Sequence, residues 1–196
     1  MAEFVRARNE SQKAQRMGEV KTVARKQFGE KPYEQISLTT IAQELGWSRA
    51  NLYKYVTSKE EIFLAVIADE RAEYDAALLE ALSGGRAMAC SDVAKAWAEV
   101  ADAHRGYFVY GALLYPVVQA NCSEEKLAEF KASYASNLEL LEKQISKALY
   151  MHDNVVEELL DAVWNQGVGL CGQGATDFKT KMRDHIRMCL EWYQRR

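Results

Sequence analysis

Residues 37–55 have the sequence SLTTIAQELGWSRANLYKY, which contains two helix starts separated by a glycine. Ser37 and Ser48 each precede residues of helical spacing, and a serine hydroxyl at such a position accepts a hydrogen bond from a free backbone N–H group. Gly46 can supply the left-handed residue that ends a helix. The stretch therefore predicts two short helices joined by a glycine-centred turn, which is the pattern of a helix-turn-helix.

The apolar residues of this stretch would face inward. Ile41, Ala42 and Leu45 share one face of the first helix, and Leu52 and Val56, four residues apart, share one face of the second. A helix-turn-helix inserts its second helix into the major groove of DNA, so the pattern favours a DNA-binding protein. However, helical hairpins that bind no DNA have the same spacing. The neighbouring residues are needed to decide whether this hairpin binds DNA.

Those neighbouring residues resemble a known family. Residues 52–61, LYKYVTSKEE, strongly resemble the end of the recognition helix and the start of the fourth helix in the TetR (tetracycline-repressor-like) family. Val20, Val23, Ala24, Phe28 and Tyr33 lie where that family has its first-helix core and a following aromatic residue. The resemblance covers about residues 16–65, a third of the chain, and implies a sequence-specific DNA-binding transcriptional regulator.

The same resemblance implies an all-α fold of about nine helices. We expect a three-helix DNA-binding domain at residues 1–58 and a helical regulatory and dimerisation domain at residues 59–196. Helical spacing places the helices at about residues 11–29, 38–45, 49–56, 59–82, 91–104, 106–120, 124–149, 153–171 and 176–194. Ser83, Gly84 and Gly85 predict a turn, and His152 lies between two helices. We expect residues 1–10 to be frayed, with Arg6 and Arg8 in a disordered tail rather than a minor-groove arm.

Three residues depart from the family's pattern. Pro32 stands where the family usually has glycine, and Trp47 stands where a smaller aliphatic residue is usual. We expect Trp47 to pack across the turn rather than to lie near the phosphates. Thr40 replaces the frequent acidic residue after the helix start, which predicts an incomplete capping box.

The chemistry of the second helix assigns roles in DNA binding. Arg49 can form a bidentate pair with guanine, Asn51 can bond a base edge, and Ala50 is small enough to meet a thymine methyl group. Side chains suited to phosphate contacts are Thr39, Thr40, Tyr53, Lys54 and Tyr55. Lys59 resembles the phosphate-contacting lysine of the family. The alternative for each is a solvated surface side chain.

Composition and charge support a protein that meets nucleic acid at one end. Residues 1–60 hold eleven basic and seven acidic residues, a balance of +4, whereas residues 61–196 hold fourteen and twenty-one, a balance of −7. The four cysteines lack zinc-ligand spacing, and no nucleophile elbow, P-loop or acid–base pair is evident. We therefore expect no catalytic residues, metal or cofactor, and a cytoplasmic protein without a membrane partner. Residues 167–172 spell GxGxxG, but no strand precedes them, so we expect close helix packing instead.

The last two helices carry apolar stripes that fit either a dimer interface or an internal core. The resemblance implies a four-helix bundle between two protomers and favours an interface, and therefore a homodimer on a pseudo-palindromic operator. The predicted interface residues are Val156, Leu160, Val163, Gly167, Phe178, Met182, Ile186 and Leu190.

The family also implies a pocket for a small-molecule inducer in the helical body. Aromatic side chains with few charges suit a small, largely apolar or aromatic ligand. The candidate ligand-binding residues are Trp97, His104, Tyr107, Tyr110, Tyr134 and Trp164, with Phe108, Tyr115, Phe130 and Gln166 as further members. Ordinary core aromatics are the alternative for each. We thus expect a repressor released by a ligand, or alternatively a protein of the same fold controlled by a protein partner.

Overall fold

The computed structural model describes residues 2–83, 88–151 and 153–195, and these residues form helices and turns without a β-strand. The helices are α1 (Ala2–Glu30), α2 (Leu38–Glu44), α3 (Arg49–Leu52), α4 (Lys59–Ala81), α5 (Cys90–Ala103), α6 (Arg105–Leu113), α7 (Gln119–Asn121), α8 (Glu124–Leu149), α9 (Asp153–Gly172) and α10 (Phe178–Tyr193). With α6, α7 and the turn between them counted as one, the described residues form nine α-helices, as predicted. Gly84, Gly85 and His152, part of the predicted loops, lie outside the described residues.

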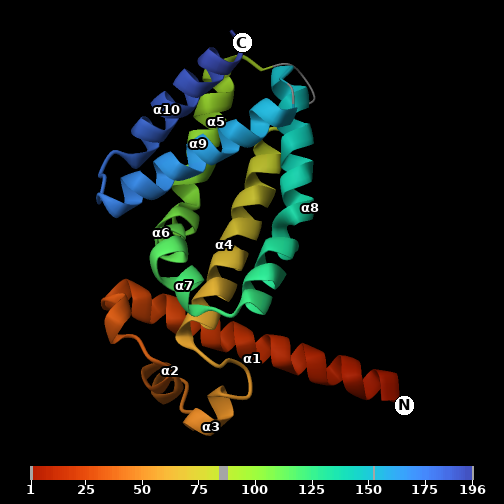
Figure 1. Ribbon diagram of the computed structural model, residues 1–196, viewed down its shortest axis with the longest axis vertical. Helices are drawn as coiled ribbons and strands as arrows, with labels where there is room; N and C mark the ends of the chain where they lie inside the picture. Colours follow the sequence, from red (N-terminus) through yellow and green to blue (C-terminus); the bar gives the residue numbers. More distant parts are fainter. Residues whose placement is uncertain (1, 84–87, 152, 196) are drawn as a thin grey trace.

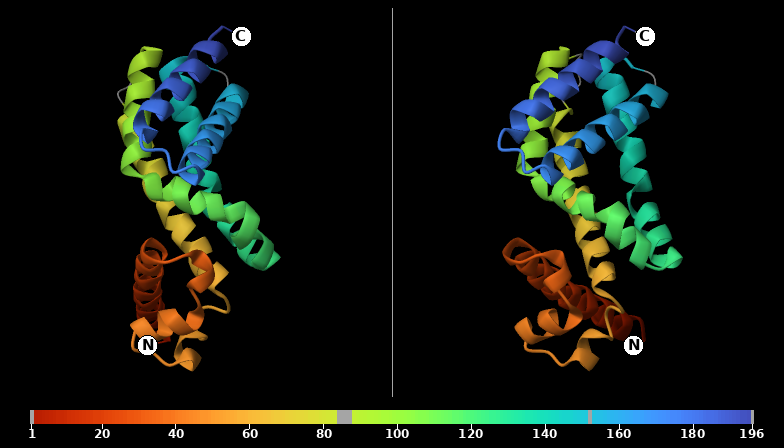
Figure 2. Two further views of the ribbon diagram at one scale, coloured as in Figure 1. Left: turned by 90° about the vertical axis from the view of Figure 1, so that its left-hand side faces the viewer. Right: turned by 60° about the vertical axis from the view of Figure 1, so that its left-hand side comes forward.

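The helices form a small unit and a larger body that share one long helix. Helices α1, α2 and α3 lie at one end, and α4 runs from this end into the body beside α8 (Figure 1). Helices α9 and α10 pack on each other, and α10 also packs along α5. Figure 2 shows that the small unit stands clear of most of the body and that α4 connects the two. A movement of α4 therefore reaches both parts.

Serine caps fix the starts of four helices at the predicted residues. The hydroxyls of Ser37, Ser48, Ser58 and Ser123 accept hydrogen bonds from backbone N–H groups at the starts of α2, α3, α4 and α8. Each cap satisfies one backbone donor that has no partner within its helix, and is worth about 1 kcal/mol. These starts were predictable because the bonded groups are only three residues apart.

Three local features differ from expectation. Helix α1 begins at Ala2, so residues 2–10 continue the helix instead of forming a frayed tail. The capping box of α2 is complete, because the Thr40 hydroxyl accepts the Ser37 N–H at 3.1 Å in the place of a carboxylate. A π-helical turn, Leu114–Val118, interrupts the predicted helix over residues 106–120. It contains Pro116, whose ring displaces the carbonyl one turn earlier and which has no N–H to donate.

The apolar stripes of α9 and α10 belong to the core of the protomer, and seven of the eight residues predicted for a dimer interface are enclosed within one chain. The side chains of α5, with fully buried Trp97 at their centre, need an apolar cover, and α10 supplies it. The residues buried inside one chain are Val156, Val163, Gly167, Phe178, Met182, Ile186 and Leu190. Leu160 is half-buried and lines a cavity. A second protomer cannot touch side chains that its partner already encloses.

Gly167 has the close-packing role predicted for it. A Cβ atom at this position would collide with the ring of Phe108 on α6. The residue is buried where α6 and α9 pack together. Glycine therefore allows these two helices to approach at a distance that no other residue permits.

Candidate nucleic-acid interface and body cavity

The turn between α2 and α3 has the geometry that its glycine predicts. Gly46 has a φ of 67°, in the left-handed region. Its N–H donates to the carbonyl of Gln43 at 3.1 Å, and the N–H of Trp47 donates to the carbonyl of Ala42 at 2.8 Å. This pair of bonds is a Schellman motif, which ends α2 and turns the chain toward α3. Ile41, Ala42 and Leu52 are buried beneath it, so the opposite face of α3 is left to solvent.

That opposite face carries the residues predicted to contact bases. Arg49 and Ala50 are exposed and Asn51 is half-buried. The Arg49 Nη2 group donates to the hydroxyl of Tyr53 at 3.2 Å, and Tyr53 is itself 47% exposed. Figure 1 shows α3 at the end of the molecule farthest from the body. The structure thus groups Arg49, Ala50, Tyr53 and exposed Lys54 on an accessible surface.

Trp47 and Tyr55 form an aromatic pair beside this surface. Their ring centroids are 5.6 Å apart, and both side chains are half-buried. The guanidinium of Arg16 on α1 lies 5.4 Å from the centroid of the Trp47 ring. Trp47 packs across the turn, as predicted, and contacts the apolar core of the small unit. Its size also brings a cation from α1 close to the start of α3.

Thr40 is an exception among the predicted phosphate contacts. Its hydroxyl donates to the side-chain carbonyl of Gln27 at 2.8 Å and accepts from the Ser37 backbone. Gln27, which the sequence interpretation missed, is 2% exposed, and its amide donates to Glu44 at 2.7 Å. The Thr40 hydroxyl is therefore committed to holding α1 against α2 and is not free to contact a phosphate. Thr39 beside it is half-buried and makes no such bond among the described residues.

Lys59 is held in place by Tyr33. Its Nζ atom donates to the Tyr33 carbonyl at 2.9 Å and lies 3.9 Å from the centroid of the Tyr33 ring. The Tyr33 hydroxyl donates to Glu60 at 2.9 Å, and burial together with this bond raises the pKa of Tyr33. Two N–H groups of Lys59 are left for other acceptors, so its position is fixed while its charge stays available.

Helices α1 and α4 are joined by a group of ion pairs. Arg25 on α1 contacts Glu70 at 3.0 Å and Asp69 at 3.1 Å, and Lys21 contacts Asp69 at 2.6 Å. Tyr110 on α6 adds an aromatic contact, because its ring centroid lies 4.9 Å from that of Phe28 on α1. The small unit is therefore attached both to α4 and to α6.

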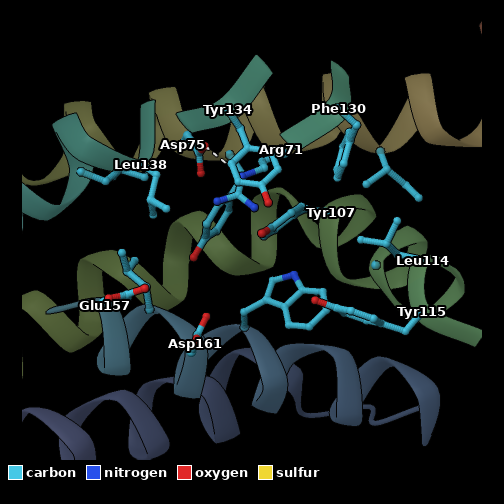
Figure 3. A pocket seen from close by; sticks show the side chains of 16 residues that line it. Arg71, Asp75, Tyr107, Leu114, Tyr115, Phe130, Tyr134, Leu138, Glu157 and Asp161 are labelled. Carbon is cyan, nitrogen blue, oxygen red and sulfur yellow. Dashed lines mark hydrogen bonds and ion pairs between the residues drawn. The ribbon is translucent and has the colours of Figure 1, made fainter. Parts of the chain in front are cut away.

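Beside these ion pairs on α4, the body contains a cavity of about 270 Å³ (Figure 3). Its walls come from α4, α6, α8, α9 and the π-helical turn Leu114–Val118. Tyr107, Tyr134 and Trp164 line it, and all three were among the candidate ligand-binding residues. Tyr115 and Phe130, suggested as further members, line it as well. The aromatic-rich segment thus does contribute to a hollow site.

The other three candidates do not line this cavity. Trp97 is fully buried in the core, where its Nε1 atom donates to the Tyr74 hydroxyl at 2.6 Å. Tyr110 packs toward the small unit, and His104 stands at the junction of α5 and α6. Phe108, one of the further members, is also fully buried in the core. Residue type alone could not distinguish these core aromatics from Trp164, which lines the cavity. Only their positions in the fold distinguish them.

The cavity also contains charged residues that the sequence interpretation missed. Arg71 and Asp75 on α4 form a pair at 3.4 Å, and the Arg71 guanidinium lies 3.7 Å from the centroid of the Tyr134 ring. Desolvation by burial raises the pKa of Asp75, although the charge and hydrogen bond of Arg71 oppose this shift. Glu157 and Asp161 on α9 line the opposite wall. The sequence pattern that could have predicted this pair is an arginine and an aspartate four residues apart on an otherwise apolar face of α4.

Comparison with known proteins agrees with this architecture. The family model described as bacterial regulatory proteins, tetR family, matches residues 22–66. A second model, described as tetracyclin repressor-like, C-terminal domain, matches residues 64–174. No curated protein sequence matches the chain.

A solved structure shares the fold. The crystal structure of a transcriptional regulator of the TetR/AcrR family from Thermobifida fusca YX-ER1 has a TM-score of 0.65 and 18% sequence identity to this chain. The match covers 91% of this chain and 98% of that one. Among the described residues, no helix combines the length and the apolar character needed to cross a membrane.

Proposed function

Because the chain belongs to the TetR family of bacterial DNA-binding transcriptional regulators, we propose that it is a repressor that leaves its operator when a small ligand occupies the body cavity. Regulators of this family are not enzymes. The observation that carries the proposal is the position of α4. Arg71 and Asp75 of this helix line the cavity, and Asp69 and Glu70, directly before them, hold α1 of the small unit.

We propose a DNA-contact surface built on α3 and its surroundings. Arg49, Ala50 and Asn51 contact base edges in the major groove. The residues proposed to contact phosphates are Thr39, Tyr53, Lys54, Tyr55 and Lys59. The exposure of Arg49 and Ala50 and the fixed position of Lys59 support this assignment.

We further propose that the repressor is a homodimer in which the outer faces of α9 and α10 meet. Met188 and Trp192 on α10 are 59% and 51% exposed, and two large apolar side chains four residues apart on one helix face suit a protein–protein interface. Two recognition helices related by a two-fold axis require a pseudo-palindromic operator. In this proposal residues 1–58 form the DNA-binding domain and residues 59–196 form the regulatory and dimerisation domain.

A ligand in the cavity acts by changing the position of α4. The cavity lies between four helices, so a molecule that fills it favours a different spacing of α4, α6, α8 and α9. The ion pairs transmit a shift of α4 to α1, and the two recognition helices then no longer match adjacent major grooves.

The test begins with genomic footprinting of the purified protein to find its operator. Release of the labelled operator is then followed by fluorescence anisotropy, with compounds handled by the products of neighbouring genes. We expect a compound that binds in the cavity to release the operator. If a compound is shown to occupy the cavity and the operator stays bound, the proposal is wrong and control by a protein partner takes its place.

A further inference from the structure

We propose that the body cavity takes a small organic cation, an arylalkyl ammonium or an aryl-substituted quaternary ammonium compound, rather than a neutral apolar molecule. The volume of 270 Å³ suits about ten non-hydrogen atoms, judged by the volume that a water molecule takes in the liquid. The inference rests on the proposed function only in treating this cavity as the ligand site. Four features of the cavity walls lead to it.

The first feature is the charge of the walls. Three carboxylates, Asp75, Glu157 and Asp161, and one guanidinium, Arg71, are the charged groups among the described residues that line the cavity. Arg71 is already paired with Asp75. Glu157 and Asp161 have no ion-pair partner among the described residues, so the cavity keeps a balance of −2. Both carboxylates are exposed, so they attract cations to the cavity with a strength that falls as salt is added.

The second feature is the aromatic lining. Tyr115 and Trp164 meet edge to face, with ring centroids 5.5 Å apart and planes at 73°. Aromatic faces attract cations, and pockets for quaternary ammonium groups are built from them. The protein already uses one face of the cavity in this way, because Arg71 lies over Tyr134. Tyr115 is 61% exposed, and together with Trp164 it offers further aromatic surface to a ligand cation.

The third feature is the hydroxyl of Tyr107. This residue is 6% exposed as a whole, and its hydroxyl, which bonds no other described residue, is not a buried atom and is therefore accessible from the cavity. Figure 3 shows Tyr107 between Tyr134 on one wall of the cavity and Asp161 on the other. Burial raises the pKa of Tyr107, so the group stays a neutral phenol. Its oxygen can accept a hydrogen bond from a protonated amine, and it presents a partial negative charge to a quaternary ammonium group, which has no N–H. The phenol could also donate to an anion, but the two unpaired carboxylates oppose an anionic ligand.

The fourth feature is the incomplete pairing of Asp75. This carboxylate is 2% exposed, and its one hydrogen-bond partner among the described residues is Arg71, at the long distance of 3.4 Å. A buried carboxylate is best stabilised by several donors. An ammonium group bound nearby would supply a second positive charge to it. A neutral apolar ligand would supply none.

The test uses three probes of one size and shape. Benzyltrimethylammonium is the cation, neopentylbenzene is its neutral isostere, and benzylsulfonate is the anion. Binding to the full-length protein is measured by titration calorimetry and by quenching of tryptophan fluorescence. We expect the cation to bind about tenfold more tightly than the neutral isostere, with an affinity that falls as salt is added, and the anion not to bind.

Variants identify the charge that matters. In the double variant Glu157→Gln, Asp161→Asn, we expect the affinity for the cation to fall about tenfold while the affinity for the neutral probe is unchanged. The control is Glu73→Gln, Glu80→Gln, which removes the same net charge from exposed positions of α4 outside the cavity lining. This control should bind all probes as the parent protein does.

The results separate the two proposals. Equal affinity for the cation and its isostere, tighter binding of the anion, or binding of none of the three overturns the ligand class. The same holds if the control loses as much affinity as the cavity variant. Cation binding that does not release the operator leaves the ligand class standing and overturns the proposed function instead.

Discussion

Arg25 on α1 and Glu70 on α4 form an ion pair at 3.0 Å, at the point where the small unit meets the body. Helix α6 comes close to the same carboxylate, because a Cβ atom on Gly106 would collide with the Glu70 side chain. Three helices therefore meet at Glu70, and the next residue, Arg71, lines the cavity. This arrangement gives a ligand in the cavity a short path to the DNA-binding unit.

Replacing Glu70 tests this path. We expect Glu70→Gln to leave ligand affinity and operator affinity close to those of the parent protein, because Glu70 touches neither. The ligand concentration that releases half of the operator should rise by about two- to fivefold, since the lost ion pair is partly exposed. Anisotropy with the labelled operator measures this midpoint, with Glu73→Gln as the control on the same helix. An unchanged midpoint would show that the coupling does not run through this pair.

Arg49 is expected to read one base pair. Arg49→Ala should weaken specific operator binding by about 1–3 kcal/mol and relax selectivity at a single position of each half-site. Binding to operators with every substitution at each position measures both effects. Lys54→Ala is the comparison and should weaken binding to all sequences alike. Unchanged operator affinity in Arg49→Ala would contradict the assignment.

Lys59 is expected to contribute affinity without selectivity. Lys59→Ala should weaken binding across all sequences and reduce the salt dependence of binding by about one phosphate contact. Because Lys59 also bonds Tyr33, its loss should lower the stability of the small unit as well. Thermal unfolding of the free protein separates the two effects. A variant with normal salt dependence would assign Lys59 a purely structural role.

Gly167 should tolerate no side chain. Gly167→Ala places a methyl group against the buried Phe108 ring, and we expect the free energy of unfolding to fall by about 1–3 kcal/mol. Gly18→Ala is the matched control, because a Cβ atom there meets nothing within 4 Å inside α1. It should raise stability by up to about 1 kcal/mol, since alanine favours helix. Urea unfolding compares the three proteins, and equal stability of both variants would refute the close approach.

Asp75 should make stability depend on pH in an unusual direction. Burial raises its pKa above the ordinary value of 3.8, so the folded protein binds this proton at a higher pH than the unfolded chain does. The ionised carboxylate opposes folding, and protonation as the pH falls through the raised pKa relieves that cost. The free energy of unfolding of the parent protein minus that of Asp75→Asn should therefore rise from pH about 7 to about 4. A difference that stays constant or falls would contradict the shift.

Local features of this chain could be predicted because their causes lie within a few residues. The hydroxyls of Ser37, Ser48 and Ser58 each accept a hydrogen bond from the backbone N–H three residues later, which caps the helix. Gly46 ends α2 because it adopts a φ of 67°. The capping box of α2 shows the limit of a residue pattern. The capping box was predicted to be incomplete because Thr40 is not acidic. The bond needs only an acceptor oxygen, however, and the Thr40 hydroxyl provides it.

The sequence by itself determined the helix-turn-helix, the order of the helices and which helix faces are apolar. It did not determine what covers each apolar face, because periodicity shows that a stripe must be buried but not against which neighbour. Only the tertiary structure decided that Phe178 and Ile186 face α5 inside the protomer. It also decided that Trp164 borders a cavity while Trp97 fills the core, and that Asp75 and Asp161 share one site. These outcomes depend on contacts between residues far apart in the chain, which local spacing does not encode.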